Sequence, residues 1–273
     1  MNKKFLFVIS GETFRYGPQG SRGRGGDKSY ERQKIASTSQ NNFIKHIKQK
    51  YDIDCDIFFS VYKFSDEWDN DFFSWYDVNP KYSNNFDNLL GEGILHSSII
   101  SYMYNGINLN DYDFVLFVRS DLFLKKYFYD IFDPFCKKVK YAHVNEITDK
   151  VGKSYNYVPN TSIPAVNHQI FFVPKNFYRN LVYGSLWNNH LSYMTAIRGG
   201  LKNTDITFFL ETYHSSSTDI TWNPIFHQVG REETDFWVDQ KYRVNPDTHH
   251  PMVVEDVNPY VDLLNNDYKN FIL

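Results

Sequence analysis

The sequence predicts an α/β fold with a mostly parallel central sheet flanked by helices. Residues 112–122 form an apolar run rich in β-branched and aromatic residues, which is typical of a strand buried on both faces, as in a parallel sheet. A second observation is the order strand, glycine-rich loop, helix, strand over residues 5–62, which makes a βαβ unit with an expected right-handed crossover. Both patterns indicate a sheet in which parallel strands dominate.

The elements of the first half follow from local patterns. Residues 5–10 are apolar and predict the first buried strand. The first helix is expected to begin near Ser29, which suits an N-cap, and to extend through Ile47. The remaining elements of this half, in chain order, are a strand at 56–62, a segment without clear periodicity at 66–88, a helix at 94–103 and the strand at Phe114 within the run 112–122.

The second half is expected to be less regular and to elaborate the core. Its predicted elements are a short strand at 141–144, a polar loop at 145–163, a strand at 168–174, a helix at 181–197, a short helix at 205–213 begun by Thr204, and a strand at 222–229. No internal repeat, low-complexity segment or linker rich in Pro, Gly or Ser divides the chain. We therefore predict a single domain over residues 1–273.

Composition narrows the partners and the compartment. With 273 residues and 42% hydrophobic residues the chain can bury a sizeable core. A formal net charge of −3 gives no global field to hold a polyanion, so nucleic acid is not an expected partner. The apolar N-terminal stretch is interrupted at residues 10–12, too early for a signal peptide, and no other stretch approaches a membrane span. We expect a cytoplasmic protein without a transmembrane segment.

Arg119-Ser120-Asp121 ends the apolar run at 112–122 and is the first candidate site. Open α/β sheets bind ligands at the carboxyl ends of their strands, which is where these residues are predicted to lie. A carboxylate there can hold Mg²⁺ or Mn²⁺ while the ion also takes the oxygens of a diphosphate. Alternatively, Asp121 caps the following turn and Arg119 only pairs with it.

The loop at 11–27 is the second candidate site. Its six glycines allow the backbone to approach a ligand closely, and Arg15, Arg22 and Arg24 supply positive charge for a phosphate group. The glycine spacing matches neither the P-loop nor the dinucleotide-binding fingerprint. An ordinary solvent-exposed surface loop is the alternative.

Three segments together resemble a known family. Residues 5–15, 56–62 and 115–122 resemble the nucleotide-sugar half of glycosyltransferases with the GT-A fold, whose central sheet is Rossmann-type and in which one strand ends in Asp-x-Asp. The last carboxylate of that motif is a metal ligand. Arg119 stands here in place of the first Asp, as in sugar-transfer enzymes of surface-polysaccharide pathways. The composition and size also resemble glycosyltransferases encoded by large DNA viruses of algae.

The resemblance implies an enzyme that transfers a sugar from a nucleoside-diphosphate sugar, UDP-linked in the expected case, to a glycan hydroxyl with inversion. Residues 1–125 would bind the donor and residues 126–273 the acceptor. Asp121 would be the ligand of Mn²⁺ or Mg²⁺, although Arg119 could itself neutralise the diphosphate. The residues implied in donor binding are Ser10, Gly11, Glu12, Thr13, Arg15, Arg22, Arg24, Tyr62, Arg119, Ser120 and Asp121.

The resemblance also implies a general base in the C-terminal half, commonly at the start of a helix. Asp205, followed by the apolar residues 206–210, fits that place, with Glu211 and Glu146 as second and third candidates. Alternatively, Asp205 is a first-turn carboxylate that complements the helix dipole.

Two other functions remain open from the sequence. A nucleotidyltransferase acting on sugar phosphates would share the nucleotide-binding half and would release pyrophosphate, but the glycine-rich signature directly after the first strand is missing. A non-catalytic glycan-binding module would bind glycan without binding nucleotide.

Overall fold

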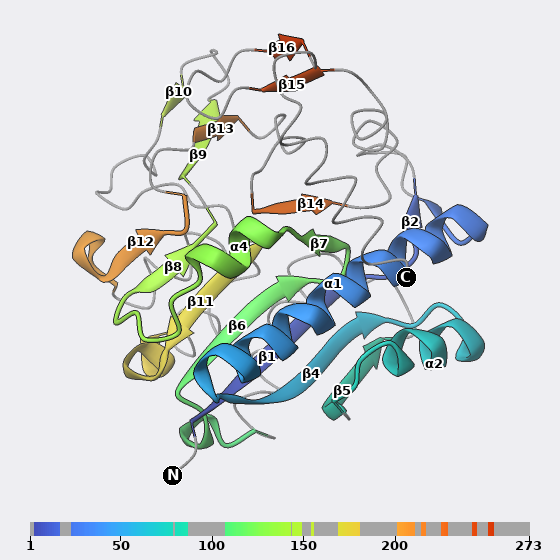
Figure 1. The fold of residues 1–273 in the computed structure, drawn as a ribbon, viewed down its shortest axis with the longest axis horizontal. Coiled ribbons are helices and arrows are strands. Elements are labelled where there is room, and N and C mark those ends of the chain that lie inside the picture. Colours follow the sequence, from blue (N-terminus) through green and yellow to red (C-terminus); the bar gives the residue numbers. More distant parts are fainter. Residues whose placement is uncertain are drawn as a thin grey trace.

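A central β-sheet organises the protein (Figure 1). The computed structural model describes residues 3–16, 23–78, 80–86, 107–142, 144–148, 154–155, 169–180, 201–210, 214–216, 225–228, 242–244 and 251–253. Within these residues seven strands form one sheet in the order β12-β8-β11-β6-β1-β4-β5. In chain order they are β1 (Lys4–Glu12), β4 (Asp54–Tyr62), β5 (Pro80–Phe86), β6 (Phe114–Arg119), β8 (Val139–Tyr141), β11 (Ile170–Pro174) and β12 (Ile206–Phe208).

The sheet is mostly parallel, as predicted. β1 pairs in parallel with both β4 and β6, β4 pairs in parallel with β5, and β12 pairs in parallel with β8. β11 is antiparallel to both of its neighbours, β6 and β8. β1 and β6 therefore lie side by side in the middle of the sheet, and their carboxyl ends point to the same edge.

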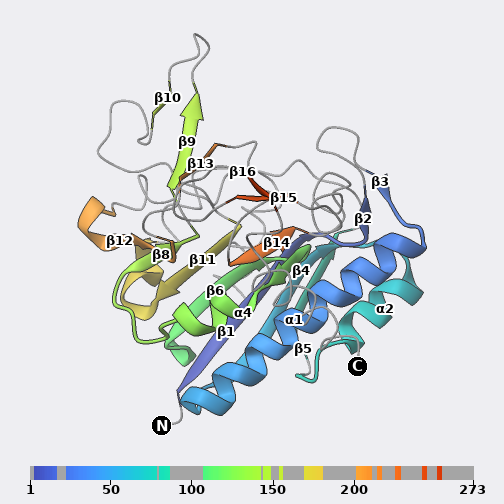
Figure 2. The same ribbon diagram turned by 45° about the horizontal axis from the view of Figure 1, so that its top comes forward.

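Three α-helices cover one face of the sheet. α1 (Asp27–Tyr51), α2 (Asp66–Ser74) and α4 (Lys126–Ile131) lie on the same side in both ribbon views (Figures 1 and 2). α1 begins two residues before the predicted Ser29, with Gly26 as the N-cap, and the Ser29 hydroxyl donates a hydrogen bond to the Gly26 carbonyl. α1 ends where Asp52 adopts a left-handed conformation with φ 53°.

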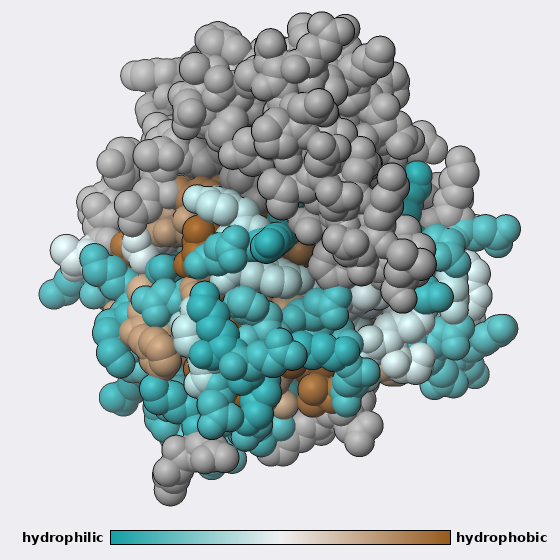
Figure 3. Space-filling view, in the orientation of Figure 1, coloured by the Kyte–Doolittle hydropathy of each residue, from teal (hydrophilic) through white to brown (hydrophobic). Residues whose placement is uncertain are grey.

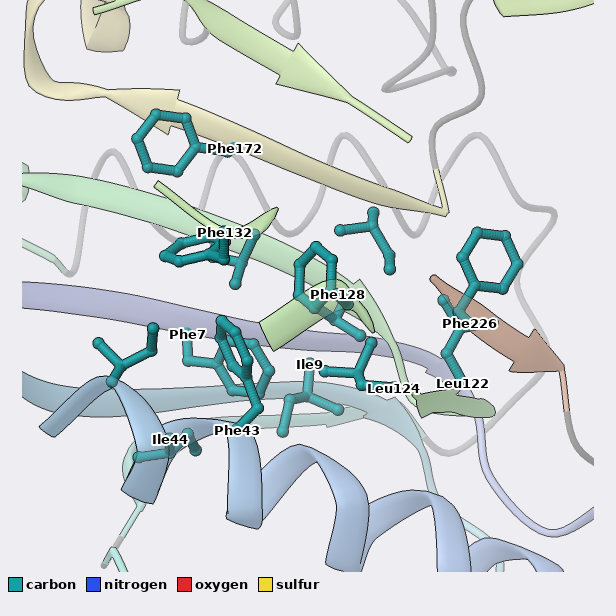
Figure 4. Close-up of a cluster of buried hydrophobic side chains, with 14 of the residues drawn as sticks. Phe7, Ile9, Phe43, Ile44, Leu122, Leu124, Phe128, Phe132, Phe172 and Phe226 are labelled. Atoms are coloured by element: carbon teal, nitrogen blue, oxygen red, sulfur yellow. The ribbon is translucent and has the colours of Figure 1, made fainter. Parts of the chain in front are cut away.

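The central strands are buried on both faces. In β1, Phe5, Phe7 and Ile9 pack into the core on the helix side, whereas Leu6 and Val8 pack into the core on the opposite side. Figure 4 shows the helix-side core, which joins the sheet to α1, α4 and β7 (Leu122–Leu124). β6 is buried in the same way, with Leu116 in the helix-side core and Val115 and Phe117 in the opposite core, so the doubly buried strand predicted from the apolar run at 112–122 is confirmed.

Several segments differ from the sequence prediction. The segment at 66–88 contains α2, capped by the Ser65 hydroxyl that accepts from the Trp68 amide, and β5. The loop predicted at 145–163 contains two antiparallel strands, β9 (Val144–Thr148) and β10 (Ser154–Tyr155). The helices predicted at 94–103 and 181–197 lie outside the described residues.

The helix predicted at 205–213 is wrong. A short 3₁₀ turn, Asn203–Asp205, leads directly into the edge strand β12. The chain continues along β8, because the amides of Phe209 and Leu210 donate to the carbonyls of Tyr141 and Ala142. Sheet pairing between distant segments has overridden the local helical pattern.

The remaining described strands are short. In the glycine-rich loop, β2 (Arg15–Tyr16) and β3 (Gly23–Arg24) form an antiparallel pair. β7 pairs with β14 (Phe226–Gln228), which agrees with the strand predicted at 222–229. The others are β13 (His214–Ser216), β15 (Tyr242–Val244) and β16 (Pro251–Val253).

The outer face of α1 is hydrophilic, as the teal surface over this helix shows in Figure 3. Across the described segments, no helix combines the length and the apolar character that crossing a membrane requires.

Phe43 of α1 tests the core packing. Its side chain is fully buried, and its ring contacts those of Phe7, Phe128 and Phe132. We expect Phe43→Ala to lower the free energy of unfolding by about 3–5 kcal/mol, because it leaves a cavity. The control is Phe135→Ala, since Phe135 is 45% exposed, and it should cost less than about 1 kcal/mol in the same denaturant titration. Equal losses would contradict this packing.

Candidate functional site

The carboxyl ends of β1 and β6 meet beside one another. Ser10 of β1 is the register partner of Arg119 of β6. The Ser120 amide donates to the Ser10 carbonyl at 2.8 Å, and the Ser120 hydroxyl donates to the Glu12 carbonyl at 2.8 Å. The structure therefore brings the end of the first strand and the Arg119-Ser120-Asp121 turn together at one edge of the sheet.

The Asp121 carboxylate lies between two guanidinium groups. Arg119 binds it in a bidentate manner, with Nε 3.0 Å from Oδ1 and Nη2 2.7 Å from Oδ2. Arg15 Nη1 donates to the same Oδ2 at 3.1 Å. The Asp121 side chain is 2% exposed, against 24% for Arg119. A buried carboxylate requires paired charge and hydrogen bonds, and these two arginines supply both.

Glu12 completes this charged cluster. Its Oε2 lies 3.1 Å from Nε of Arg15, whose side chain is 6% exposed. The cluster of Glu12, Arg15, Arg119 and Asp121 thus contains two positive and two negative groups, and its formal charge is zero. Arg119 is the most exposed of the four side chains. Solvent therefore reaches mainly the Arg119 guanidinium, at 24% exposed, and the Glu12 carboxylate, at 16%.

Helix α1 holds the turn at Asp121 through two buried glutamines. Gln33 Nε2 donates to the Ser120 carbonyl at 2.8 Å, and its Oε1 accepts from the Phe14 amide at 3.1 Å. Gln40 Nε2 donates to the Leu122 carbonyl at 2.8 Å and to the Arg119 carbonyl at 3.1 Å. The two glutamines fix the backbone on both sides of Asp121 and tie it to the glycine-rich loop.

Sequence reasoning missed these glutamines, although a signal was present. Gln33, Ser37 and Gln40 are spaced like the core-facing positions of a helix, and Ile44 and Ile47 continue the same stripe. Polar residues on the buried stripe of a helix need partners inside the fold. The partner here is the backbone of the β6–β7 turn.

Arg24 of the glycine-rich loop is bound to protein carbonyls. Its guanidinium donates to the carbonyls of Thr13, Tyr62 and Lys63 and to the Thr13 hydroxyl. Burial lowers the pKa of this guanidinium from its ordinary value. The described contacts give Arg24 the role of fastening the loop to the end of β4, whereas the sequence suggested a phosphate ligand.

Backbone geometry explains one glycine of this loop. Gly11, the penultimate residue of β1, has φ 117°, a backbone conformation that residues with a Cβ rarely adopt. An added Cβ would lie 3.5 Å from the Ser120 hydroxyl oxygen. Gly11 therefore lets the chain leave β1 beside the Ser120 turn.

The other predicted donor-binding residues are distributed as follows. Thr13 is fully buried and accepts from Arg24. Tyr62 lies in the core on the face away from the helices and is 3% exposed, so its ring packs in the protein interior. Arg22 lies outside the described residues.

The structure does not bring Asp205 to the Asp121 edge. Strand registers place Ile206 beside Val139, which lies at the level of Val115 in β6. Asp205 is therefore near the amino-terminal edge of the sheet, about 20 Å from Asp121 along the strand direction. Its carboxylate accepts from the Lys202 amide at 2.8 Å, a local turn contact. A general base should lie near the donor at the Asp121 edge, whereas Asp205 lies near the opposite edge of the sheet.

The other two base candidates follow strands that run toward the carboxyl edge of the sheet. β8 and β12 run parallel to β6, so both end toward the edge that carries Asp121. Glu146 lies in β9, which begins three residues after β8 ends. Glu211 follows three residues after the end of β12 and is outside the described residues.

The side chains at Asp121 do not fit a divalent metal ion. Among the described residues no group of three or more His, Cys, Asp or Glu side chains is arranged to hold one. Both Asp121 oxygens already accept hydrogen bonds from guanidinium groups. The predicted Mn²⁺ or Mg²⁺ ligation by Asp121 is therefore not supported by its neighbours.

A cavity of about 640 Å³ lies at the opposite edge of the sheet. Its lining includes Lys3 and Phe114 at the amino-terminal ends of β1 and β6, Phe135 in the segment after α4, and Lys175 after β11. This cavity is separate from the charged cluster, and we do not place the donor site there because the strands' carboxyl ends lie at the other edge.

Comparisons with known proteins give only distant similarities. No protein family model matches the chain, and no curated protein matches it. Among solved structures, Drosophila β1,4-galactosyltransferase 7 in complex with manganese, UDP-Gal and xylobiose is 12% identical, with 83% of this chain and 71% of that chain covered and a TM-score of 0.39.

Two further similar structures differ in activity. The 4-diphosphocytidyl-2C-methyl-D-erythritol synthase of Anaerococcus prevotii is 11% identical, with coverage of 86% and 96% of the two chains and a TM-score of 0.44. A glycosyltransferase involved in glycosylation of the major capsid of PBCV-1 is 10% identical, with coverage of 63% and 61% and a TM-score of 0.30. Similarities this distant do not assign an activity to this chain.

Gln40 tests how the site is held in place. We expect Gln40→Leu to lower the free energy of unfolding by about 2 kcal/mol or more, because it leaves the Leu122 carbonyl and the Tyr76 hydroxyl without this partner. The control is Gln49→Leu, since Gln49 is exposed on the same helix. Thermal unfolding measures both variants, and similar melting temperatures for the two would contradict the role of Gln40.

Proposed function

We propose that the protein is a glycosyltransferase that moves a sugar from a nucleoside-diphosphate sugar, with UDP as the expected nucleotide, to a glycan hydroxyl with inversion. The observation that carries this proposal is the cluster of Glu12, Arg15, Arg119 and Asp121 at the carboxyl ends of β1 and β6. Open α/β sheets bind ligands at that edge. We propose further that residues 1–125 bind the donor and residues 126–273 the acceptor within a single domain.

The chemistry of the cluster suits a diphosphate. Guanidinium groups present planar pairs of donors that match phosphate oxygens, and they stay charged at all physiological pH values. Arg119 is held by Asp121 and is still 24% exposed. During transfer negative charge grows on the leaving diphosphate, and a preorganised cation at this edge stabilises it.

The acceptor hydroxyl needs a general base on the other face of the donor sugar. Inversion follows when the hydroxyl attacks the anomeric carbon opposite the diphosphate and a carboxylate takes its proton. We propose Glu146 or Glu211 for this role, supported by the direction of β8 and β12. Asp205 is not retained, because it lies at the opposite edge of the sheet.

Donor binding is the first test of this function. Arg119→Ala should weaken UDP binding about tenfold or more in calorimetry, because it removes the exposed cation of the cluster. The control is Arg179→Ala, an exposed arginine that follows the end of β11 at the amino-terminal edge. UDP affinity should be unchanged in that variant.

Two results would replace the proposal. Release of pyrophosphate from a nucleoside triphosphate and a sugar phosphate would indicate a nucleotidyltransferase. Glycan binding without any binding of UDP or UDP-sugars would indicate a non-catalytic module.

The general base is tested by isosteric substitution. We expect either Glu146→Gln or Glu211→Gln to lower kcat about a hundredfold while UDP affinity is retained, because only the proton acceptor is removed. Asp205→Asn should keep kcat close to that of the parent. Loss of turnover in Asp205→Asn with an unchanged melting temperature would restore Asp205 and contradict its placement.

A further inference from the structure

We propose that Asp121 is a positioning residue that holds Arg119 and Arg15, and that these guanidinium groups take the place of a divalent cation at the donor diphosphate. This inference rests on the proposed function and deepens it, because it states how the charge of the donor is met. It concerns the chain's own side chains at the carboxyl edge of β1 and β6.

The hydrogen bonds of Asp121 carry the first step. Oδ2 accepts from both Arg119 and Arg15, and Oδ1 accepts from Arg119. Oxygen ligation of Mg²⁺ needs lone pairs of such oxygens at about 2.0–2.1 Å. An ion that used Oδ2 would have to displace one guanidinium from a carboxylate that is 2% exposed. Oδ2 is therefore committed to holding the two arginines.

The side chains of the cluster differ in their exposure to solvent. The side chains of Asp121 and Arg15 are 2% and 6% exposed, whereas Arg119 is 24% exposed. The accessible part of the cluster is therefore the Arg119 guanidinium together with the Glu12 carboxylate, which is 16% exposed and paired with Arg15. Metal binding at Asp121 needs that carboxylate to be accessible, whereas a diphosphate alone needs an accessible cation. The greater exposure of Arg119 than of Asp121 suits the diphosphate alone.

Hydrogen bonds from α1 fix the backbone of the β6–β7 turn. The Arg119 and Leu122 carbonyls are bound by Gln40, and the Ser120 carbonyl is bound by Gln33. The backbone that carries Arg119 is therefore fixed on both sides. A cation held in this way needs little rearrangement when the diphosphate arrives.

Metal binding is tested on the protein without nucleotide. We expect Mn²⁺ titration, followed by electron paramagnetic resonance and by thermal unfolding, to show no binding at Asp121 at up to about 1 mM. Asp121→Asn should lower the melting temperature, because it removes the negative charge between two guanidinium groups. The control is Asp130→Asn, at an exposed position of α4. Stabilisation of the parent by Mn²⁺ that Asp121→Asn abolishes would overturn the inference.

Nucleotide binding is the second arm. UDP affinity in EDTA should be within about threefold of that in Mn²⁺, and Arg119→Gln should lower it about tenfold in both buffers. Since Arg119 is partly exposed, this variant also serves if Asp121→Asn fails to fold. UDP binding that requires Mn²⁺, or that Mn²⁺ restores in Arg119→Gln, would overturn the inference. UDP binding in neither buffer would overturn the proposed function, and the Mn²⁺ titration would still decide the role of Asp121.

Discussion

The burial of Asp121 is the constraint on which the site depends. A carboxylate that is 2% exposed is costly unless charges and hydrogen bonds compensate it, and Arg119 and Arg15 provide them. Arg15 is itself buried and requires Glu12 in turn. These ion pairs hold the glycine-rich loop against the end of β6, because Glu12 ends β1 and Arg15 begins β2. The local fold and the charge of the candidate site therefore have one origin.

Helix α1 links this site to the core of the protein. Its buried stripe is polar at Gln33 and Gln40, where it meets the β6–β7 turn, and apolar at Ile44 and Ile47, where it meets the sheet. Substitutions on the polar part of the stripe should therefore affect both stability and the position of Arg119. The same helix thus contributes to folding and to placing the site.

The sequence predicted the parts of the fold that local pattern determines. The apolar run of β1 predicted a buried strand and that of β6 a strand buried on both faces, and the position of Arg119 at the end of the second run placed it at the carboxyl edge of the sheet. The sequence predicted a helix where β12 contains Ile206. Local pattern could not reveal this strand, because its pairing with β8 joins segments far apart in the sequence. The contacts of Gln33 and Gln40 with the turn also depend on the tertiary fold. Pattern alone gives the buried stripe but not its partners.

A crystal structure of the protein with UDP tests the central claim most directly. The account predicts a diphosphate hydrogen-bonded to the Arg119 guanidinium at the carboxyl ends of β1 and β6, with Asp121 still bound to both arginines. A metal ion coordinated by Asp121, with Arg119 turned away, would contradict the account of charge at the site. UDP bound in the cavity beside Lys3 and Lys175, at the opposite edge of the sheet, would contradict the location of the site itself.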